Sequence, residues 1–155
     1  MTTLKDLIRA IPPLDHAAMQ AAEQHINGLA KPPRSLGRLE DLAVHLAGMP
    51  GIDHPDNLPK EIIVMCADHG VFAEGVAVTP QEVTAIQARN IQKQLTGVCA
   101  VARSNGTSVL PVDIGIDCDP IDDMISLKLA RGCGNIAKGP AMSYADAEHL
   151  LVASA

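Results

Sequence analysis

The segment CADHGVFAEG, residues 66–75, carries side chains that can bind a metal ion or move a proton. Asp68 and His69 come directly after the apolar run EIIVM, and Glu74 lies in the loop that follows. One histidine and two carboxylates without a second histidine make a weak metal signature. The alternative is structural: Asp68 accepts loop amide hydrogens, His69 packs against the end of a strand and Glu74 lies in solvent.

A second group of carboxylates, Asp113, Asp117 and Asp119, follows in the segment DIGIDCDP. Their spacing matches no EF-hand loop, because the glycine and the closing glutamate of that loop are missing. Carboxylates at the end of a strand often accept hydrogen bonds from neighbouring loops, so we interpret these three as structural.

The glycine-rich segment RGCGNIAKGPA, residues 131–141, contains Gly134, Asn135 and Lys138. Its amides together with Lys138 could cradle a phosphate ahead of a helix. It is neither a P-loop nor a dinucleotide-binding fingerprint, and the glycines could simply permit a tight turn.

Polar side chains near position 80 could form hydrogen bonds with the edge of a flat heterocycle. The sequence Thr79-Pro80-Gln81-Glu82 predicts a helix start with a capping hydroxyl, and Gln87 follows about two turns later. If that end of the helix faces the crevice, Gln87 lies on its wall; otherwise it is an exposed helix residue.

The elements that position these side chains form an α/β pattern. A continuous apolar run at 61–67 predicts a strand covered on both faces. A helix interrupted near Thr96 and a second strand at 107–116 complete a βαβ unit, although Pro111 indicates that this strand begins late or lies at an edge. A third strand is expected at 125–130, and Ser143 with Asp146 predicts the cap of a last helix.

The first third of the chain is predicted to be helical. Asp15 is a good N-cap for a helix that ends before Pro32, and Ser35 is expected to cap the next helix. The run GIDHPDNLPK, residues 51–60, predicts a loop or hinge. We therefore expect a helical cap at 1–50 and an incomplete α/β domain at 51–155, together forming one globular unit.

Composition excludes several classes of function. The 155 residues carry a formal net charge of −6 and few aromatic side chains, which argues against nucleic-acid binding. The four scattered cysteines favour reduced cytosolic thiols over a disulfide framework or structural zinc. The start lacks the pattern of a signal peptide, so we expect a cytoplasmic protein without a membrane segment.

Four stretches taken together show a resemblance that runs along nearly the whole chain. They are HINGLAKPPRSLGRLEDLAVHLAGMPG, VMCADHGVFAEGVAVTPQEVTAIQ, VDIGIDCDP and ARGCGNIAKGPAMS. The chain resembles the amino-terminal part of the nicotinate-nucleotide:dimethylbenzimidazole phosphoribosyltransferase family, which makes α-ribazole phosphate for the lower ligand of cobalamin. The resemblance implies a small, mainly parallel Rossmann-like sheet of about three strands flanked by helices, with an amino-terminal helical cap.

The resemblance also implies an activity and a set of site residues. Family members move the ribose phosphate of nicotinate mononucleotide to a benzimidazole nitrogen, which requires no metal and no cofactor. The resemblance implies that Asp68, His69 and Glu74 line the crevice. The positions matching the benzimidazole pocket are Thr79, Gln87, Val76 and Val78.

The same resemblance implies what this chain does not contain. The catalytic glutamate of the family and its main phosphate-binding loops lie beyond the matching part, so no residue here is assigned as the catalytic base. Arg34 stands where the family commonly has glycine, which predicts strain of roughly 1 kcal/mol if the backbone has positive φ. Leu36, Leu39 and Leu46 are expected to be partly uncovered.

Three functions remain as alternatives at this stage. The chain is part of a phosphoribosyltransferase that needs a complementing carboxyl-terminal part, or a non-catalytic module that binds a benzimidazole or a protein partner. The third is a metal-dependent hydrolase that uses Asp68, His69 and Glu74. The expected partners are small-molecule substrates, a second copy of the chain or a complementing part, with no nucleic acid and no membrane.

Overall fold

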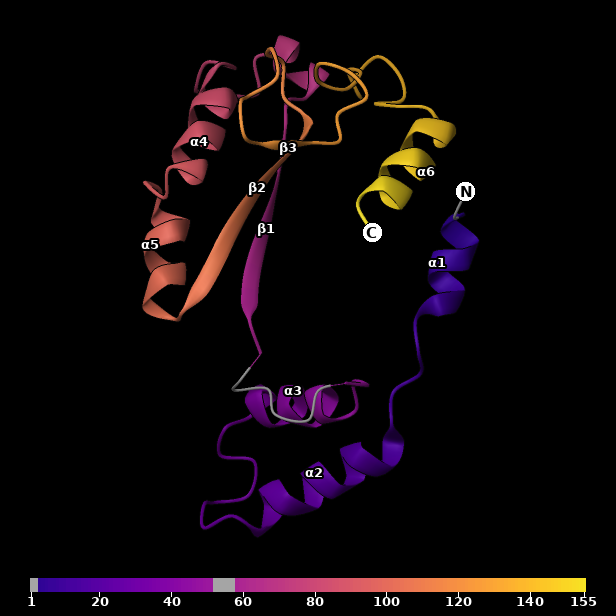
Figure 1. Cartoon of the computed structure of the whole chain (residues 1–155), viewed down its shortest axis with the longest axis vertical. Helices are drawn as coiled ribbons and strands as arrows, with labels where there is room; N and C mark the ends of the chain where they lie inside the picture. The colour runs from indigo at the N-terminus through magenta and orange to yellow at the C-terminus, as the bar shows by residue number, and fades with distance from the viewer. Residues whose placement is uncertain (1–2, 52–57) are drawn as a thin grey trace. The chain divides into compact units, whose positions relative to one another are not determined.

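The computed structural model of the chain describes residues 3–51 and 58–155 (Figure 1). The chain divides into two compact units, Met1–Leu7 with Pro59–Ala155, and Ile8–Leu58. Most of the predicted hinge at 51–60 lies outside the described residues. The elements are α1 Leu4–Ala10, α2 His16–Gly28, α3 Arg38–Ala47, β1 Lys60–Ala67, a 3₁₀ helix Gly70–Glu74, α4 Val83–Gln92, α5 Gly97–Ser104, β2 Thr107–Gly115, β3 Ile125–Ser126 and α6 Tyr144–Ala153. No described helix is long and apolar enough to cross a membrane.

The larger unit is built on a parallel three-stranded sheet in the order β1-β2-β3, as predicted. Helices α4 and α5 connect β1 to β2 and pack against these strands (Figure 1). Val64 of β1 contacts two clusters of small aliphatic side chains that form the core between the sheet and these helices. The core contains no aromatic side chain among its buried residues, in keeping with the composition.

The predictions for two of the strands need correction. β2 runs through Pro111 and lies in the centre of the sheet, so the expectation of a late or edge strand is wrong. The central position is tolerated because β3 pairs only with Val112 and Asp113, so no ladder bond on that side requires the missing amide hydrogen. The third strand is accordingly shorter than predicted and ends at Ser126.

The helix predicted to start at Thr79 begins instead at Val83, without a side-chain cap. The amides of Val83 and Thr84 bond to the carbonyl oxygens of Pro80 and Gln81, so these residues form turns rather than a helical first turn. The side chain of Gln81 donates to Asp117 at 3.1 Å, which ties this turn to the end of β2. A long-range contact therefore replaces the local cap.

In the smaller unit, α2 and α3 pack against each other. Asp15 caps α2 as predicted, because its side chain accepts from the amides of Ala17 and Ala18. The prediction that Ser35 caps α3 is wrong: the helix begins after Gly37, and the side chain of Glu40 reaches back to the amide of Leu36.

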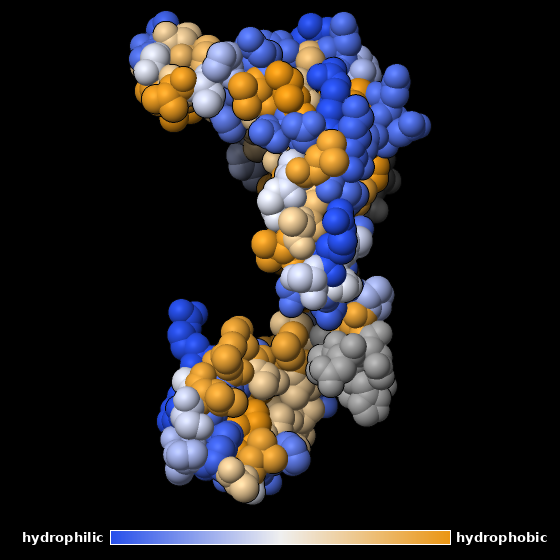
Figure 2. Space-filling view, turned by 90° about the vertical axis from the view of Figure 1, so that its left-hand side faces the viewer, coloured by the Kyte–Doolittle hydropathy of each residue, from blue (hydrophilic) through white to orange (hydrophobic). Residues whose placement is uncertain are grey.

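Two features of this unit agree with the expectations from sequence. Arg34 has φ of 56°, the left-handed conformation in which a non-glycine side chain costs roughly 1 kcal/mol. The apolar face of α3 is exposed, and Figure 2 shows orange hydrophobic surface gathered over the part that α2 and α3 form. The exposed leucines on or next to α3 are Leu36, Leu39, Leu42 and Leu46.

Candidate active-site crevice

The crevice begins where β1 ends, at Asp68. This side chain is 6% exposed, and its Oδ2 accepts a hydrogen bond from the amide of Asp117 at 2.8 Å. Its amide donates to Gly115 and its carbonyl accepts from Cys133. Asp68 therefore holds the loop after β2 and the glycine-rich segment against the end of β1, as the structural interpretation predicted.

A cavity of about 210 Å³ opens beside Asp68. Apolar side chains from the 3₁₀ helix and the following loop form part of its wall, and Thr79 and Gln81 add polar groups from the turn before α4. The full lining is Ala67, Asp68, His69, Val71, Phe72, Val76, Ala77, Thr79, Pro80, Gln81 and Thr84. Apolar walls with a few polar groups are the usual composition of a small-molecule site.

The structure brings together some of the predicted pocket residues and leaves others outside the cavity. Val76 and Thr79 line it, whereas Val78 and Gln87 do not. Val78 is fully exposed, and Gln87 lies on an exposed position of α4. Because α4 begins at Val83 rather than Thr79, Gln87 is less than two turns into the helix.

Asp113 stabilises the turn after β2 and forms a buried ion pair. Its Oδ1 accepts from the amides of Gly115 and Ile116, and Lys128 Nζ lies 2.8 Å from its Oδ2. Burial raises the pKa of this carboxyl, but hydrogen bonds from Lys128 and the two amides outweigh burial and lower the pKa overall. Asp113 is therefore a charged structural group that shapes the turn after β2.

The crevice carboxylate Glu74 is paired with the glycine-rich segment rather than lying alone in solvent. Asn135 Nδ2 donates to Glu74 Oε1 at 2.6 Å, and Lys138 Nζ lies 3.1 Å from the same oxygen. These hydrogen bonds, that of Asn135 more than that of Lys138, hold the pKa of Glu74 below its ordinary value. Three residues predicted separately, for the crevice and for a phosphate loop, thus form one cluster.

Several amides that were predicted to cradle a phosphate are already bonded within the chain. The amide of Gly134 donates to Ala141, and the amides of Lys138 and Gly139 donate to the carbonyl of Asn135. The amide of Ala137 donates to the Asn135 side chain. Asn135 therefore acts as the centre of a local turn, and the phosphate role of this segment stays a prediction.

No group of three His, Cys, Asp or Glu side chains in residues 3–51 and 58–155 is arranged to hold a metal ion. Asp68 is bonded to the amide of Asp117, and Glu74 is bonded to Asn135 and Lys138. These contacts do not favour the metal-dependent hydrolase.

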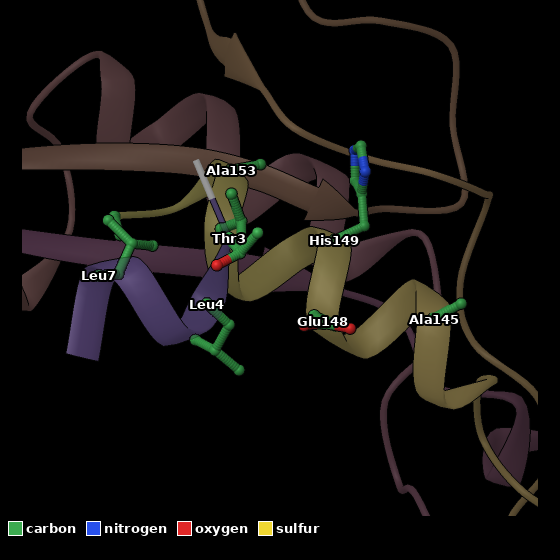
Figure 3. Close-up of a pocket in the computed structure, with 9 residues that line it drawn as sticks. Thr3, Leu4, Leu7, Ala145, Glu148, His149 and Ala153 are labelled. Carbon is green, nitrogen blue, oxygen red and sulfur yellow. The ribbon is translucent and has the colours of Figure 1, made fainter. Parts of the chain in front are cut away.

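A larger hollow of about 780 Å³ lies between the start of α1 and α6, within the larger unit. Its lining is mostly apolar, and Figure 3 shows Leu4 and His149 extending away from each other. Its polar lining residues are Thr3, Glu148 and His149, fewer than those that line the crevice cavity, so it is a weaker candidate despite its size.

The comparisons with known proteins agree with the geometry. A family model described as Phosphoribosyltransferase matches residues 11–155. The chain belongs to the nicotinate-nucleotide:dimethylbenzimidazole phosphoribosyltransferase family. It is 57% identical over 153 residues to the enzyme of that name from Salmonella agona strain SL483 and equally so to that of Salmonella paratyphi C strain RKS4594.

Solved structures of this phosphoribosyltransferase family have the same fold. The enzyme from Thermus thermophilus has a TM-score of 0.79 at 34% identity, covering 90% of this chain and 43% of its own. A structure titled CobT from the same organism has a TM-score of 0.76 at 35% identity, with 88% and 42% covered. The chain spans 43% of the length of the curated relatives, and the predicted α/β fold class is confirmed.

Sequence reasoning missed the contacts that Lys128 and Cys133 make near the candidate crevice. Lys128 Nζ donates to the carbonyls of Ile116 and Cys118 as well as pairing with Asp113. Lys128 lies in a predicted strand, where a lone lysine carries no signal. Cys133 was counted only as a reduced thiol, although it lies in the same glycine-rich segment as Asn135.

The replacement Asn135→Leu is expected to raise the pKa of Glu74 toward its ordinary value, because it removes the stronger of the two donors. Lys138→Met removes the weaker donor and is the matched control, with a smaller rise expected. The stabilising contribution of these hydrogen bonds is present above the ordinary Glu74 pKa of 4.5 and is lost as the pH falls through the lowered value. NMR titration of the Glu74 carboxyl carbon measures its pKa in both variants. An unchanged Glu74 pKa in Asn135→Leu contradicts the explanation that Asn135 lowers this pKa.

Proposed function

We propose that this chain forms the base-binding part of an enzyme of cobalamin biosynthesis. The reaction transfers ribose 5-phosphate from nicotinate mononucleotide to 5,6-dimethylbenzimidazole and gives α-ribazole 5′-phosphate and nicotinate. The observation that carries the proposal is the crevice cavity, lined by Val76, Thr79 and His69, in a chain that belongs to this family.

The dimensions and lining of the cavity support a flat, mainly apolar base as its occupant. Its volume of about 210 Å³ is below the roughly 300 Å³ at which pockets for drug-sized ligands begin. Val71, Phe72 and Val76 provide apolar contact, and the Thr79 hydroxyl provides a hydrogen-bonding group for an azole nitrogen. Val78 and Gln87 belong to this proposal only if they approach the base when it binds.

The carboxylates of the crevice are poor candidates for the catalytic base. Asp68, Glu74 and Asp117 all accept hydrogen bonds within the chain. A general base works best with a pKa near the working pH, and the hydrogen bonds from Asn135 and Lys138 hold the pKa of Glu74 below its ordinary value. We therefore propose that the base comes from the part of the family that this chain does not match, supplied by a complementing part or a second polypeptide.

The decisive experiment follows release of nicotinate from nicotinate mononucleotide and dimethylbenzimidazole. The purified chain is assayed alone and with the carboxyl-terminal part of the Salmonella agona relative. Turnover only in the mixture supports the proposal. Turnover by the chain alone overturns our assignment of the base to another part.

Direct binding of dimethylbenzimidazole separates a binding module from an inert chain, and equilibrium dialysis measures it. Binding without turnover in either assay favours the non-catalytic alternative. Absence of binding contradicts the assignment of the cavity as a benzimidazole site.

The cytoplasmic location stays a prediction.

The replacement Thr79→Val is expected to weaken binding of dimethylbenzimidazole about two- to tenfold. One hydrogen bond contributes about 0.5–1.5 kcal/mol, and each 1.4 kcal/mol changes affinity tenfold. Thr107→Val at the start of β2 is the matched control, because Thr107 is absent from the cavity lining. Equal effects of the two replacements in dialysis contradict a contact between Thr79 and the base.

The replacement Gln87→Ala tests the second polar position of the proposed pocket. Weaker binding of the base, with Thr107→Val unchanged, supports a place for Gln87 in the occupied pocket. Unchanged binding removes Gln87 from the site and agrees with its exposed position on α4.

A further inference from the structure

A thiol and an imidazole meet at the edge of the crevice. Cys133 Sγ lies 3.5 Å from His69 Nδ1, within reach of a hydrogen bond to sulfur. His69 lines the base cavity, whereas Cys133 lines a separate small cavity beneath α6. The pair therefore lies between two hollows of the larger unit.

The backbone holds this pair in register. His69 and Cys133 form an isolated parallel bridge. The amide of Gly70 donates to the Cys133 carbonyl at 3.1 Å, and the amide of Cys133 donates to the Asp68 carbonyl at 3.2 Å. These backbone hydrogen bonds lie on both sides of the pair and hold the sulfur and the nitrogen next to each other.

The other three cysteines have different surroundings. Cys66 and Cys99 are buried, and burial, followed by the charge of Asp113, raises the pKa of the Cys66 thiol. Cys118 is half-buried like Cys133 but packs against the core cluster. In the described part of the chain, the thiol of Cys133 is the one that the structure pairs with an imidazole.

We propose that Cys133, with His69 as its base, is a thiol-modification site for low-molecular-weight disulfides and other soft electrophiles. The Cys133 thiol gives its proton to His69 Nδ1 as its sulfur forms a bond to one sulfur of the disulfide. The disulfide bond breaks, and the departing thiolate takes the proton from the imidazolium. The products are a mixed disulfide on Cys133 and one free thiol, so protons and electrons balance.

A second hydrogen bond competes with this arrangement. Cys133 Sγ also lies 3.4 Å from the carbonyl oxygen of Gly134, which can accept the thiol hydrogen but cannot carry its proton away. Activation therefore depends on His69. The inference does not rest on the proposed transfer reaction, because it concerns the thiol alone.

The test measures rates of modification at each cysteine by peptide mass spectrometry, with iodoacetamide and with glutathione disulfide as probes. In native buffer, Cys133 is expected to react at least about tenfold faster than Cys118, a modest effect for a positioned base. In concentrated urea the four rates should converge, which gives the reference for each peptide. A Cys133 rate at or below that of Cys118 in native buffer overturns the proposal.

The replacement His69→Asn keeps a polar group near the position of Nδ1 but removes the base. It is expected to lower the Cys133 rate at least about fivefold while Cys99 stays protected, which reports that the fold is intact. In His69→Gly, added imidazole is expected to restore the rate, a result that a purely structural role does not give. A rate independent of His69, or no rescue in a folded His69→Gly variant, overturns the proposal. If both variants unfold, the native rates of Cys133 and Cys118 decide.

Discussion

Replacing Lys128 with methionine is expected to lower the free energy of unfolding by about 3–5 kcal/mol at neutral pH. Lys128 Nζ lies 2.8 Å from Asp113 Oδ2, and the two side chains are 12% and 1% exposed. Methionine fills a similar volume but leaves the carboxylate buried without its counter-charge. The hydrogen bonds from the backbone amides of Gly115 and Ile116 remain, but they cannot neutralise the charge of the Asp113 carboxylate. Urea unfolding followed by circular dichroism measures the loss.

The size of this loss should depend on pH. In the unmodified chain the pKa of Asp113 is lowered, so its stabilising contribution is present above the ordinary value of 3.8 and is lost as the pH falls through the lowered value. Without Lys128, burial is the dominant influence and raises the pKa of this carboxyl. Protonation of Asp113 then removes the unpaired buried charge in the variant. The difference in free energy of unfolding between the variant and the unmodified chain therefore becomes smaller toward acid pH. A gap that does not change with pH contradicts this explanation.

The matched control is Lys138→Met, because it removes the other lysine that pairs with a carboxylate of the larger unit. The Lys138 side chain is 72% exposed and its partner Glu74 lies near the surface. Exposed pairs contribute little to stability, so the control should lower the free energy of unfolding far less than Lys128→Met does. Similar losses of free energy of unfolding in the two variants would show that burial of an ion pair does not determine how much the pair stabilises the fold.

The double variant Asp113→Asn with Lys128→Met separates the lost charge pair from lost packing. It removes the buried carboxylate, so it should be more stable at neutral pH than Lys128→Met alone. No recovery would indicate that the loss comes from the lysine stem rather than from its charge.

Local patterns in the sequence predicted the features of the fold that depend on neighbours in the chain. The apolar run at 61–67 became β1, and Ser143 with Asp146 forms the predicted reciprocal cap of α6. The interruption near Thr96 is also present, as the break between α4 and α5. Each of these depends on side chains within a few positions of one another.

The errors arose where another side-chain contact takes the place of the predicted cap. Thr79 has the sequence of a helix cap, but the adjoining Gln81 bonds to Asp117, and the chain forms turns there instead. Glu40 bonds to Lys31 and to the amide of Leu36 and takes the place that Ser35 was predicted to hold. Such contacts leave no periodic signal in the sequence.

The sequence indicated candidate site residues but not the contacts between them. Asp68 and Glu74 were selected from residue type and position after a strand, and Asn135 was selected from the glycine-rich segment. Some of their partners lie far away in the sequence, as in the bond between Asn135 and Glu74, which are 61 positions apart. No spacing rule relates positions so far apart, and a structure is needed to show that the 3₁₀ helix and the glycine-rich segment lie against each other.

The replacement Gly70→Ala is expected to push the 3₁₀ helix and the glycine-rich segment apart and to destabilise the larger unit by about 1–3 kcal/mol. A Cβ at Gly70 would lie 2.6 Å from the carbonyl oxygen of Cys133 and 2.7 Å from the amide nitrogen of Asn135. These are backbone atoms, which cannot rotate away as a flexible side chain would. The glycine-rich segment must therefore move, and the hydrogen bond from Gly70 to Cys133 is weakened or lost.

Gly139→Ala is the matched control for this prediction, because it lies in the same glycine-rich segment and a Cβ there meets no atom within 4 Å. Its effect on the free energy of unfolding should stay within about 0.5 kcal/mol. Urea unfolding compares the two variants, and the rate of Cys133 alkylation reports whether the segment has moved from His69. Gly70→Ala should lower both the free energy of unfolding and the rate of Cys133 alkylation, because the close approach of Gly70 to the glycine-rich segment holds the two segments together and pairs the thiol with the imidazole. Loss of stability with a Cys133 rate that is unchanged would show instead that the two loops stay in contact without Gly70.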